Sequence, residues 1–468
     1  SKEGFKIELQ VKEKNPLLCR IPEDGINPKK IIKNAVEFFL NNIPHWRSSR
    51  NQYNICAPSN SASVALMSLA QEYNIHNINS DFAGNCIFIE DIISKIMADL
   101  AGLDKSRVRA IFSFGGTASN LYAMKLALNK VIPEIGKRGI PENVCMVITE
   151  DSHFSHKTAA DWLGIGTDRL IIIKSDQEGR SLLKDAEQKI EKAIKDGKIV
   201  AGWTINGGPF YNFAIDDIKW FCNLRKKLIK KYNLPYVPHI HVDSVIGWVW
   251  LMFKDYDFKK NPLGINKEPL RLIKKQAKRI SFIKLADSWG VDFHKGVSGV
   301  PVPAGLFVSN NADDLIKLSK KHSKICETHH LGGYWALKDP SDITLETSRS
   351  AGPALATLGS LLSLGKKGFR TLLSNQIECS IYLRKKISST QFICANEKAL
   401  GFNSMIILAN KKIFNKGEKR NWTNLKKKLD IDEKLLDFLN ETLKSFYHWC
   451  LDKNRLGCSF SSSFYKTK

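Results

Sequence analysis

The chain has 468 residues, of which 43% are hydrophobic and 25% are charged, as in ordinary globular proteins. This composition excludes an intrinsically disordered chain, a collagen and a small disulfide-linked scaffold, and the length suffices for a large core. Lysine and arginine (71) exceed aspartate and glutamate (47), which gives a formal net charge of +24.

The positive charge is spread along the chain in short runs, such as residues 225–227 and 426–428. No aromatic residues alternate with these runs, and no nucleic-acid-binding motif accompanies them. We therefore expect solvated surface charge and no nucleic-acid partner, with a polyanion site as the open alternative.

The ten cysteines form no C-x-x-C pair and have no regular spacing, which favours free thiols in a reducing compartment and no metal site. The first residues carry no apolar signal core. The longest apolar run, residues 245–253, is less than half of the roughly 20 residues that a membrane-spanning helix needs. We expect a cytoplasmic protein without a membrane segment.

After an N-terminal segment at residues 1–60, short apolar runs alternate with amphipathic stretches over residues 61–365. This alternation predicts a large α/β domain with a mostly parallel, seven-stranded sheet. The expected strands are 108–114, 144–149, 169–173, 199–204, 239–243, 283–287 and 305–309, and the expected helices are 119–131, 156–163, 181–196 and 215–231.

The pattern changes at residues 366–468, which predict a small C-terminal α/β domain. A helix is expected at 369–388, a strand at 402–409 and a second helix at 435–449.

A glycine-rich turn lies between the first expected strand and its helix. Glycine lets the backbone approach a ligand closely, and the amides of a helix N-terminus favour an anion. The functional interpretation is a phosphate held by Gly116, Thr117, Ala118 and Ser119. An ordinary turn followed by a helix N-cap is the alternative.

Three further polar residues follow expected strands. His153 comes after residue 149, Asp243 ends the strand 239–243, and Lys295 follows His294 after the strand 283–287. A histidine at the position of His153 faces the crevice where α/β proteins bind ligands. A buried carboxylate such as Asp243 needs a hydrogen-bond donor or a cation. A lysine held out of water, as Lys295 would be, is a nucleophile. Taken alone, each residue has a structural explanation. His153 could be a core histidine, Asp243 a helix cap or an ion-pair partner, and Lys295 an exposed loop lysine.

Together these features are the parts that a pyridoxal-phosphate site requires. The turn would hold the phosphate, the lysine would form the Schiff base, the aspartate would keep the ring nitrogen protonated, and the histidine would cover the ring.

The chain strongly resembles the group II pyridoxal-phosphate decarboxylases, which include glutamate, cysteine-sulfinate, aromatic amino-acid and histidine decarboxylases. The resemblance runs from about residue 41 to the 360s. It is most specific in F-G-G-T-A-S-N at 114–120, H-F-S at 153–155, H-V-D at 241–243, and A-D-S at 286–288 with H-K at 294–295.

The resemblance assigns a role to each matching residue. It implies that Lys295 binds the cofactor covalently, that Asp243 contacts the ring nitrogen, and that His294 contacts the phosphate. It gives the place over the ring to His153 and not to His156.

The resemblance also implies fold type I, a homodimer with a shared active site, and α-decarboxylation. A tyrosine on a loop before the small domain often donates the final proton in this family, and Tyr334 is the candidate here. Ser244, next to Asp243, is expected to contact the cofactor.

Two alternatives concern the reaction. Residues 153–168 are most similar to the glutamate and cysteine-sulfinate branch, which slightly favours an acidic substrate over an aromatic one. Ser244 and the turn at residues 206–210 depart from the decarboxylase pattern, and H-V-D-S is similar to the sphingosine-phosphate lyase branch. A carbon–carbon lyase or aldolase is therefore the alternative activity, and a non-enzymatic basic binding protein is a third possibility.

Overall fold

The computed structural model describes residues 21–40, 51–52, 55–132, 134–319, 339–387, 392–409, 411–415, 417–452 and 457–458. The chain divides into two compact units, Ser1–Tyr53 with His448–Ser459, and Asn54–Tyr447 with Phe460–Lys468. The first unit contains helix α2 (Pro28–Phe38) and a parallel pair of β1 (Asn51–Gln52) and β11 (Gly457–Cys458). The domain boundaries expected after residues 60 and 365 stay predictions.

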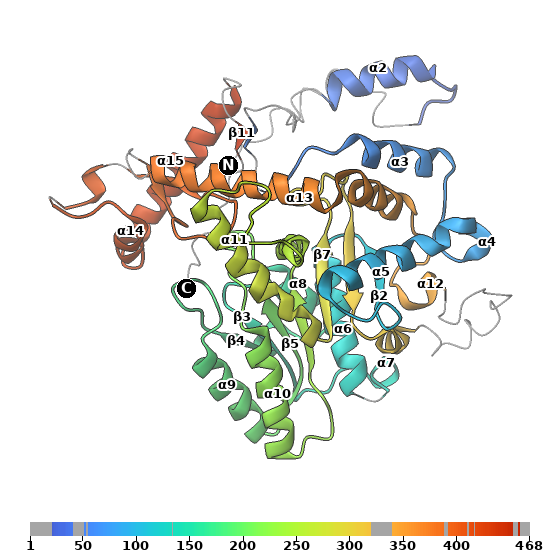
Figure 1. The fold of residues 1–468 in the computed structure, drawn as a ribbon, viewed down its shortest axis with the longest axis horizontal. Helices are drawn as coiled ribbons and strands as arrows, with labels where there is room; N and C mark the ends of the chain where they lie inside the picture. Colours follow the sequence, from blue (N-terminus) through green and yellow to red (C-terminus); the bar gives the residue numbers. More distant parts are fainter. Residues whose placement is uncertain are drawn as a thin grey trace. The chain divides into compact units, whose positions relative to one another are not determined.

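The second unit is built around a seven-stranded sheet (Figure 1). Six strands run in one direction, and β8 is antiparallel to both of its neighbours. A mostly parallel sheet of seven strands was predicted and is confirmed. The spatial order is β2 (Arg109–Ser113), β8 (Gly305–Ser309), β7 (Ser288–Asp292), β6 (His239–Asp243), β5 (Ile199–Asn206), β3 (Val144–Thr149) and β4 (Leu170–Ile173).

One predicted strand is wrong. Residues Ser281–Leu285 form a 3₁₀-helix (η5), and β7 begins at Ser288, beyond the expected strand 283–287. Gly290 in the middle of β7 argues against a strand by propensity. A Cβ atom at Gly290 would lie 3.1 Å from Val245 Cγ1 and 3.3 Å from Ser119 Cβ, so glycine permits the close approach of the next layer.

Helices cover both faces of the sheet (Figure 1). The four expected helices are confirmed to within a few residues: α6 (Gly116–Val131), α8 (Ser155–Trp162), α9 (Leu183–Lys195) and α10 (Ile218–Tyr232). Buried residues of α6 and α8 pack on one face, whereas those of α5 (Ile89–Ala101), α9 and α10 pack on the other. In the part of the chain that the structure describes, the other helices of this unit before α13 are α3 (Ser61–Glu72), α4 (Ser80–Ala83), α7 (Ile135–Arg138), α11 (Lys267–Ile280) and α12 (Pro340–Ile343). The 3₁₀-helices are η2 (Gly84–Phe88), η3 (Thr167–Arg169), η4 (Gly247–Phe253) and η6 (Ala312–Leu318), besides η5.

The C-terminal elements have a small hydrophobic cluster of their own. Helix α13 (Gly352–Ile387) bends at Gly365, whose φ is 56°, and its second part is the helix expected at 369–388. Strands β9 (Phe392–Cys394) and β10 (Ile406–Leu408) are antiparallel, so the expected strand 402–409 is shorter than predicted. Helices α14 (Trp422–Leu429) and α15 (Glu433–Asp452) complete this part around Ile393, Ala409, Phe414, Leu425, Leu429, Leu436 and Leu439. Within the described ranges, no helix is both long and apolar enough to cross a membrane.

A buried ion pair holds the outer edge of β2. Arg349 donates to both carboxylate oxygens of Glu90 at 3.0 and 3.1 Å. Glu90 accepts the backbone amide of Phe112 at 3.1 Å, and Arg349 donates to the Phe112 carbonyl at 2.9 Å. Since β2 is an end strand, these side chains replace the missing ladder partners. The pair therefore anchors the strand that leads into the Gly115–Gly116 turn.

We expect Arg349→Met to lower the free energy of unfolding by about 3 kcal/mol or more, because Glu90 would remain buried without its cation. Urea denaturation measures this change. The control is Lys192→Met, which breaks the exposed pair with Asp196 and should change stability by less than about 1 kcal/mol. Equal, small effects of both substitutions would contradict the anchoring role.

Candidate active site

The polar residues singled out in the sequence lie at one edge of the sheet. Because β2, β3, β6 and β7 run in the same direction, their carboxyl ends meet there. Asp243 ends β6, the Gly115–Gly116 turn follows β2, His153 follows β3, and Lys295 follows β7. This edge is the candidate active site.

Asp243 is a buried carboxylate with two side-chain donors. Asn120 Nδ2 lies 3.1 Å and His156 Nε2 lies 2.9 Å from Asp243 Oδ2. Because a carboxylate only accepts, His156 carries its proton on Nε2. Burial alone would raise the pKa of Asp243, but the hydrogen bond from His156 and the nearby imidazoles outweigh it and hold the pKa below its usual range. Asp243 is therefore ionised and suited to a cationic partner.

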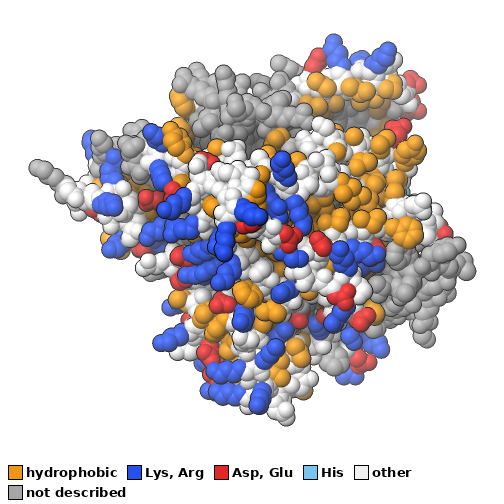
Figure 2. Space-filling model, viewed as in Figure 1, with side chains coloured by type: hydrophobic (Ala, Val, Ile, Leu, Met, Phe, Trp, Pro, Cys, Tyr) orange, Lys and Arg blue, Asp and Glu red, His pale blue; other side chains and the backbone are white. Residues whose placement is uncertain are grey.

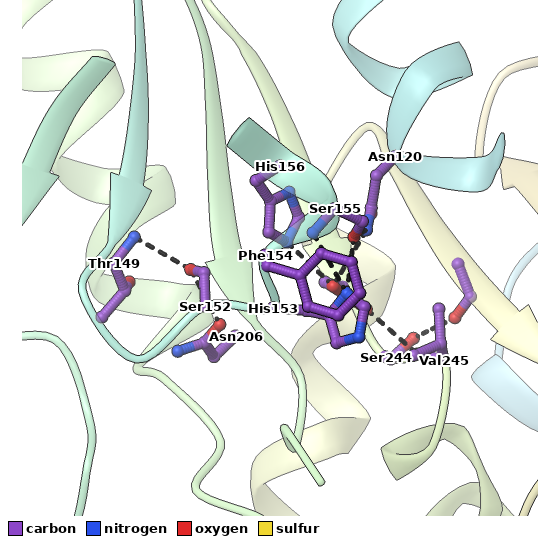
Figure 3. A network of polar contacts seen from close by, with 12 residues as sticks. Asn120, Thr149, Ser152, His153, Phe154, Ser155, His156, Asn206, Ser244 and Val245 are labelled. Carbon is purple, nitrogen blue, oxygen red and sulfur yellow. Dashed lines mark hydrogen bonds and ion pairs between the residues drawn. The ribbon is translucent and has the colours of Figure 1, made fainter. Parts of the chain in front are cut away.

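His153 lies two residues before the start of α8, next to Phe154 and Ser155 (Figure 3). Its Nδ1 accepts the Ser155 amide at 3.2 Å and lies 2.8 Å from the Ser155 hydroxyl. Burial lowers the pKa of His153 to about 4, although the charge of Asp243 acts in the opposite direction. The ring is neutral at pH 7. The centre of the His153 ring lies 4.2 Å from the centre of the Phe154 ring and 6.4 Å from that of Phe210.

The turn before α6 is where the phosphate is expected to bind, and a histidine lies beside it. Gly115 has a φ of 123°, and α6 begins at Gly116. The amides of Gly116 and Thr117 precede the first helical hydrogen bonds, which Ala118 and Ser119 donate to the Gly115 carbonyl. A Cβ atom at Gly115 would lie 3.7 Å from His294 Cε1. His294 Nδ1 accepts the Ala304 amide at 3.2 Å, which leaves the proton on Nε2. Burial lowers the pKa of His294, so the neutral ring can donate from Nε2.

Lys295 reaches the same edge from the segment after β7. Its Nζ lies 2.7 Å from Asp292 Oδ2, and Asp292 is completely buried. The side chain of Lys295 is 20% exposed, so a ligand can reach the amine. The alternative interpretation of Lys295 as a fully exposed loop lysine is therefore wrong.

The other residues predicted in the turn have different surroundings. Thr117 is exposed and Ala118 is buried. The Ser119 hydroxyl donates to the Leu306 carbonyl at 3.2 Å. The backbone amides of Ala118 and Ser119 donate to the Gly115 carbonyl at 3.0 and 3.1 Å. The cofactor contacts predicted for Thr117, Ala118 and Ser119 stay predictions.

Two further site residues were predicted from the sequence, Ser244 and Tyr334. The Ser244 hydroxyl donates to the Gly290 carbonyl at 2.8 Å and thereby joins β7 to the segment after β6. Tyr334, the predicted proton donor, lies outside the described residues. The roles predicted for both residues stay predictions.

A family model, described as the pyridoxal-dependent decarboxylase conserved domain, matches residues 12–267, which is more than half of the chain. The chain belongs to the pyridoxal-dependent decarboxylase family. An acidic amino acid decarboxylase (GADL1) of Xenopus tropicalis is 31% identical over 183 residues, or 39% of this chain. The match spans 34% of that curated relative's length.

Solved structures of decarboxylases share the fold. Mouse CSAD in its apo form is 18% identical with a TM-score of 0.75 over 96% of this chain and 84% of that chain. Catharanthus roseus tryptophan decarboxylase, solved with L-tryptophan, is 13% identical with a TM-score of 0.68 over 95% of this chain and 84% of that chain. The predicted type I fold of pyridoxal-phosphate enzymes is confirmed.

The side chains of this decarboxylase-family member fit pyridoxal phosphate, the cofactor predicted from the sequence and confirmed by the family. The α6 N-terminus and His294 would hold the phosphate, and ionised Asp243 would hold the protonated ring nitrogen. His153 would cover a ring face, and Lys295 supplies the amine.

Sequence reasoning missed His156 and Asn120 as the donors to Asp243. His156, Ala159 and Ala160 have the 3–4 spacing of one helix face, and all three are buried. That spacing predicts an inward-facing histidine, but it does not identify the carboxylate on another strand that accepts its proton.

We expect Gly116→Ala to weaken pyridoxal phosphate binding by about tenfold or more, equivalent to ~1.4 kcal/mol. A Cβ atom at Gly116 would lie 2.7 Å from Val245 Cγ1 and 2.9 Å from Asp292 Oδ2, so the α6 N-terminus must shift. Titration of the apo protein followed by absorbance measures the affinity. Gly136→Ala is the control because no atom lies within 4 Å of the new Cβ. Wild-type affinity in both variants would contradict the expected phosphate site.

Proposed function

We propose that this chain catalyses the pyridoxal-phosphate-dependent α-decarboxylation of an L-amino acid to the amine and carbon dioxide. The observation that carries the proposal is the convergence of Lys295, ionised Asp243 and neutral His153 at one edge of the sheet, beside the α6 N-terminus. Family membership supports the same reaction.

Bound pyridoxal phosphate supplies an electron sink for the pair released when the carboxylate leaves. Asp243 would keep a proton on the ring nitrogen, because its carboxylate is ionised and held by Asn120 and His156. His153 would exclude water from one side of the site, and Lys295 would hold the cofactor through its amine. Tyr334 stays the proposed proton donor.

We propose an acidic substrate such as glutamate, aspartate or cysteine sulfinate. Support comes from the 31% identity to a relative named as an acidic amino acid decarboxylase and from the net charge of +24. Phe154 and Phe210 beside His153 would instead suit an aromatic side chain, which is the second candidate substrate class. The alternative lyase activity gains no support from Ser244, because its hydroxyl donates to Gly290.

We expect carbon dioxide and an amine from at least one acidic amino acid when the purified protein is supplied with pyridoxal phosphate. Lys295→Ala should lower the rate by about three orders of magnitude or more. Lys184→Ala, an exposed lysine on α9, is the matched control and should keep the wild-type rate. Product analysis distinguishes a decarboxylase from a carbon–carbon lyase, since aldehyde without carbon dioxide indicates a lyase. Turnover of aromatic amino acids alone would overturn the acidic preference.

We also propose a homodimer, on the evidence of an apolar surface over α3, α5 and α13 (Figure 2). Leu69 is 51% exposed, Ile92 is 43% exposed and Leu362 is 69% exposed. Ile92, Leu361 and Leu362 line one hollow of about 450 Å³, to which α5 and α13 both contribute. Exposed apolar groups that gather in this way are typical of protein interfaces.

We expect Leu362→Glu to shift the protein from dimer toward monomer in size-exclusion chromatography with light scattering, because a charge would be buried in the interface. Ile431→Glu alters an apolar side chain that is 86% exposed before α15 and should leave the dimer intact. A dimer in both variants would place the interface elsewhere.

A further inference from the structure

Asp292 differs from the other buried carboxylates of the sheet. Asp287, just before β7, accepts the Ile240 amide at 2.7 Å and is paired with Arg225. Asp216 accepts the amides of Ser181 and Asn206 at 2.6 and 2.7 Å. Asp292 is as buried as Asp216 and more buried than Asp287, but neither of its carboxylate oxygens has a hydrogen-bond partner among the described residues. Its charge is balanced at close range by Lys295, 2.7 Å away.

The groups around this pair come from several elements. His294 Nε2 lies 3.6 Å from Asp292 Oδ2, and Cys56 faces Lys295 across an isolated backbone bridge. Burial raises the pKa of the Cys56 thiol, so the thiol is neutral at pH 7. His153, just before α8, interacts electrostatically with both Lys295 and Asp243, which ends β6. The α6 N-terminus lies against Asp292 at Gly116, so it favours the negative charge of Asp292.

This arrangement constrains the lysine proton. When Lys295 becomes a neutral amine, Asp292 loses the cation that compensates it, and a bare buried carboxylate is strongly unfavourable. A proton transferred from Nζ to Oδ2 removes both charges together. Nζ and Oδ2 are 2.7 Å apart without hydrogen-bond alignment, so a turn of the lysine chain that points an N–H at Oδ2 would allow the transfer.

We propose that Asp292 is a catalytic residue that exchanges a proton with Lys295 as the lysine binds and releases the cofactor, an inference that rests on the proposed function. On binding, the Nζ–H bond breaks and an Oδ2–H bond forms. The neutral amine then condenses with the cofactor aldehyde, and one water leaves. On release the proton returns from Oδ2 to Nζ. A merely structural carboxylate would carry no such proton.

The test uses the apo protein and Asp292→Asn, which preserves shape but removes the charge. Acetylation of Lys295 by acetic anhydride, quantified by mass spectrometry of its peptide, reports the free amine as a function of pH. Loss of the carboxylate destabilises the ammonium form, so the labelling profile should move to lower pH by about one unit or more. Asp292→Ala is the second variant, for use if Asp292→Asn folds poorly, and its labelling profile should shift in the same direction.

Asp287→Asn is the control, because it removes a partly buried carboxylate at the other end of β7 and should leave the profile unchanged. A second readout is the pH titration of the absorbance of the bound cofactor. Because the proposal leaves Asp292 protonated and neutral while the cofactor is bound, Asp292→Asn should leave this titration unchanged, whereas a carboxylate that stays ionised would make the variant titrate at lower pH. An unchanged labelling profile in both Asp292 variants, or a shifted cofactor titration in Asp292→Asn, would overturn the inference. Labelling does not require turnover, so a shift without carbon dioxide release would overturn the proposed function alone.

Discussion

Burial of the Asp243 carboxylate is the constraint on which the rest of the site depends. A buried charge must be hydrogen-bonded, and the two donors come from different helices, Asn120 from α6 and His156 from α8. These bonds tie both helices to the end of β6. They thereby fix the Gly115–Gly116 turn at the start of α6 and His153 next to the start of α8. The requirement to satisfy one carboxylate positions the other parts of the site.

The outer edge of the sheet faces a related requirement. An end strand has backbone groups without ladder partners, and the Glu90–Arg349 pair supplies them to Phe112. The turn that is expected to hold the phosphate begins directly after this strand. The position of this turn therefore depends on a buried ion pair between two residues that are 259 positions apart in the chain.

Most of the fold and part of the site could be predicted from the sequence. Apolar periodicity located six of the seven strands, and short polar motifs located Lys295, Asp243 and His153 at one edge. The strand β7 was predicted too early in the chain, because Gly290 breaks the apolar pattern. A glycine is needed there because Val245 and Ser119, on other elements, leave no room for a Cβ atom. The partners of Asp243 and the pairing of Asp292 with Lys295 were not foreseen, since both are contacts between elements or across a turn.

By itself the sequence determined the element types, their alternation and the family-specific motifs, because these depend on local spacing and residue chemistry. It also determined the charge of +24. Only the tertiary structure decided which polar groups compensate one another. His156 became a donor to Asp243, and Asp292 was left with Lys295 as its counter-charge, because burial raises the free energy of any charge that finds no partner in the fold.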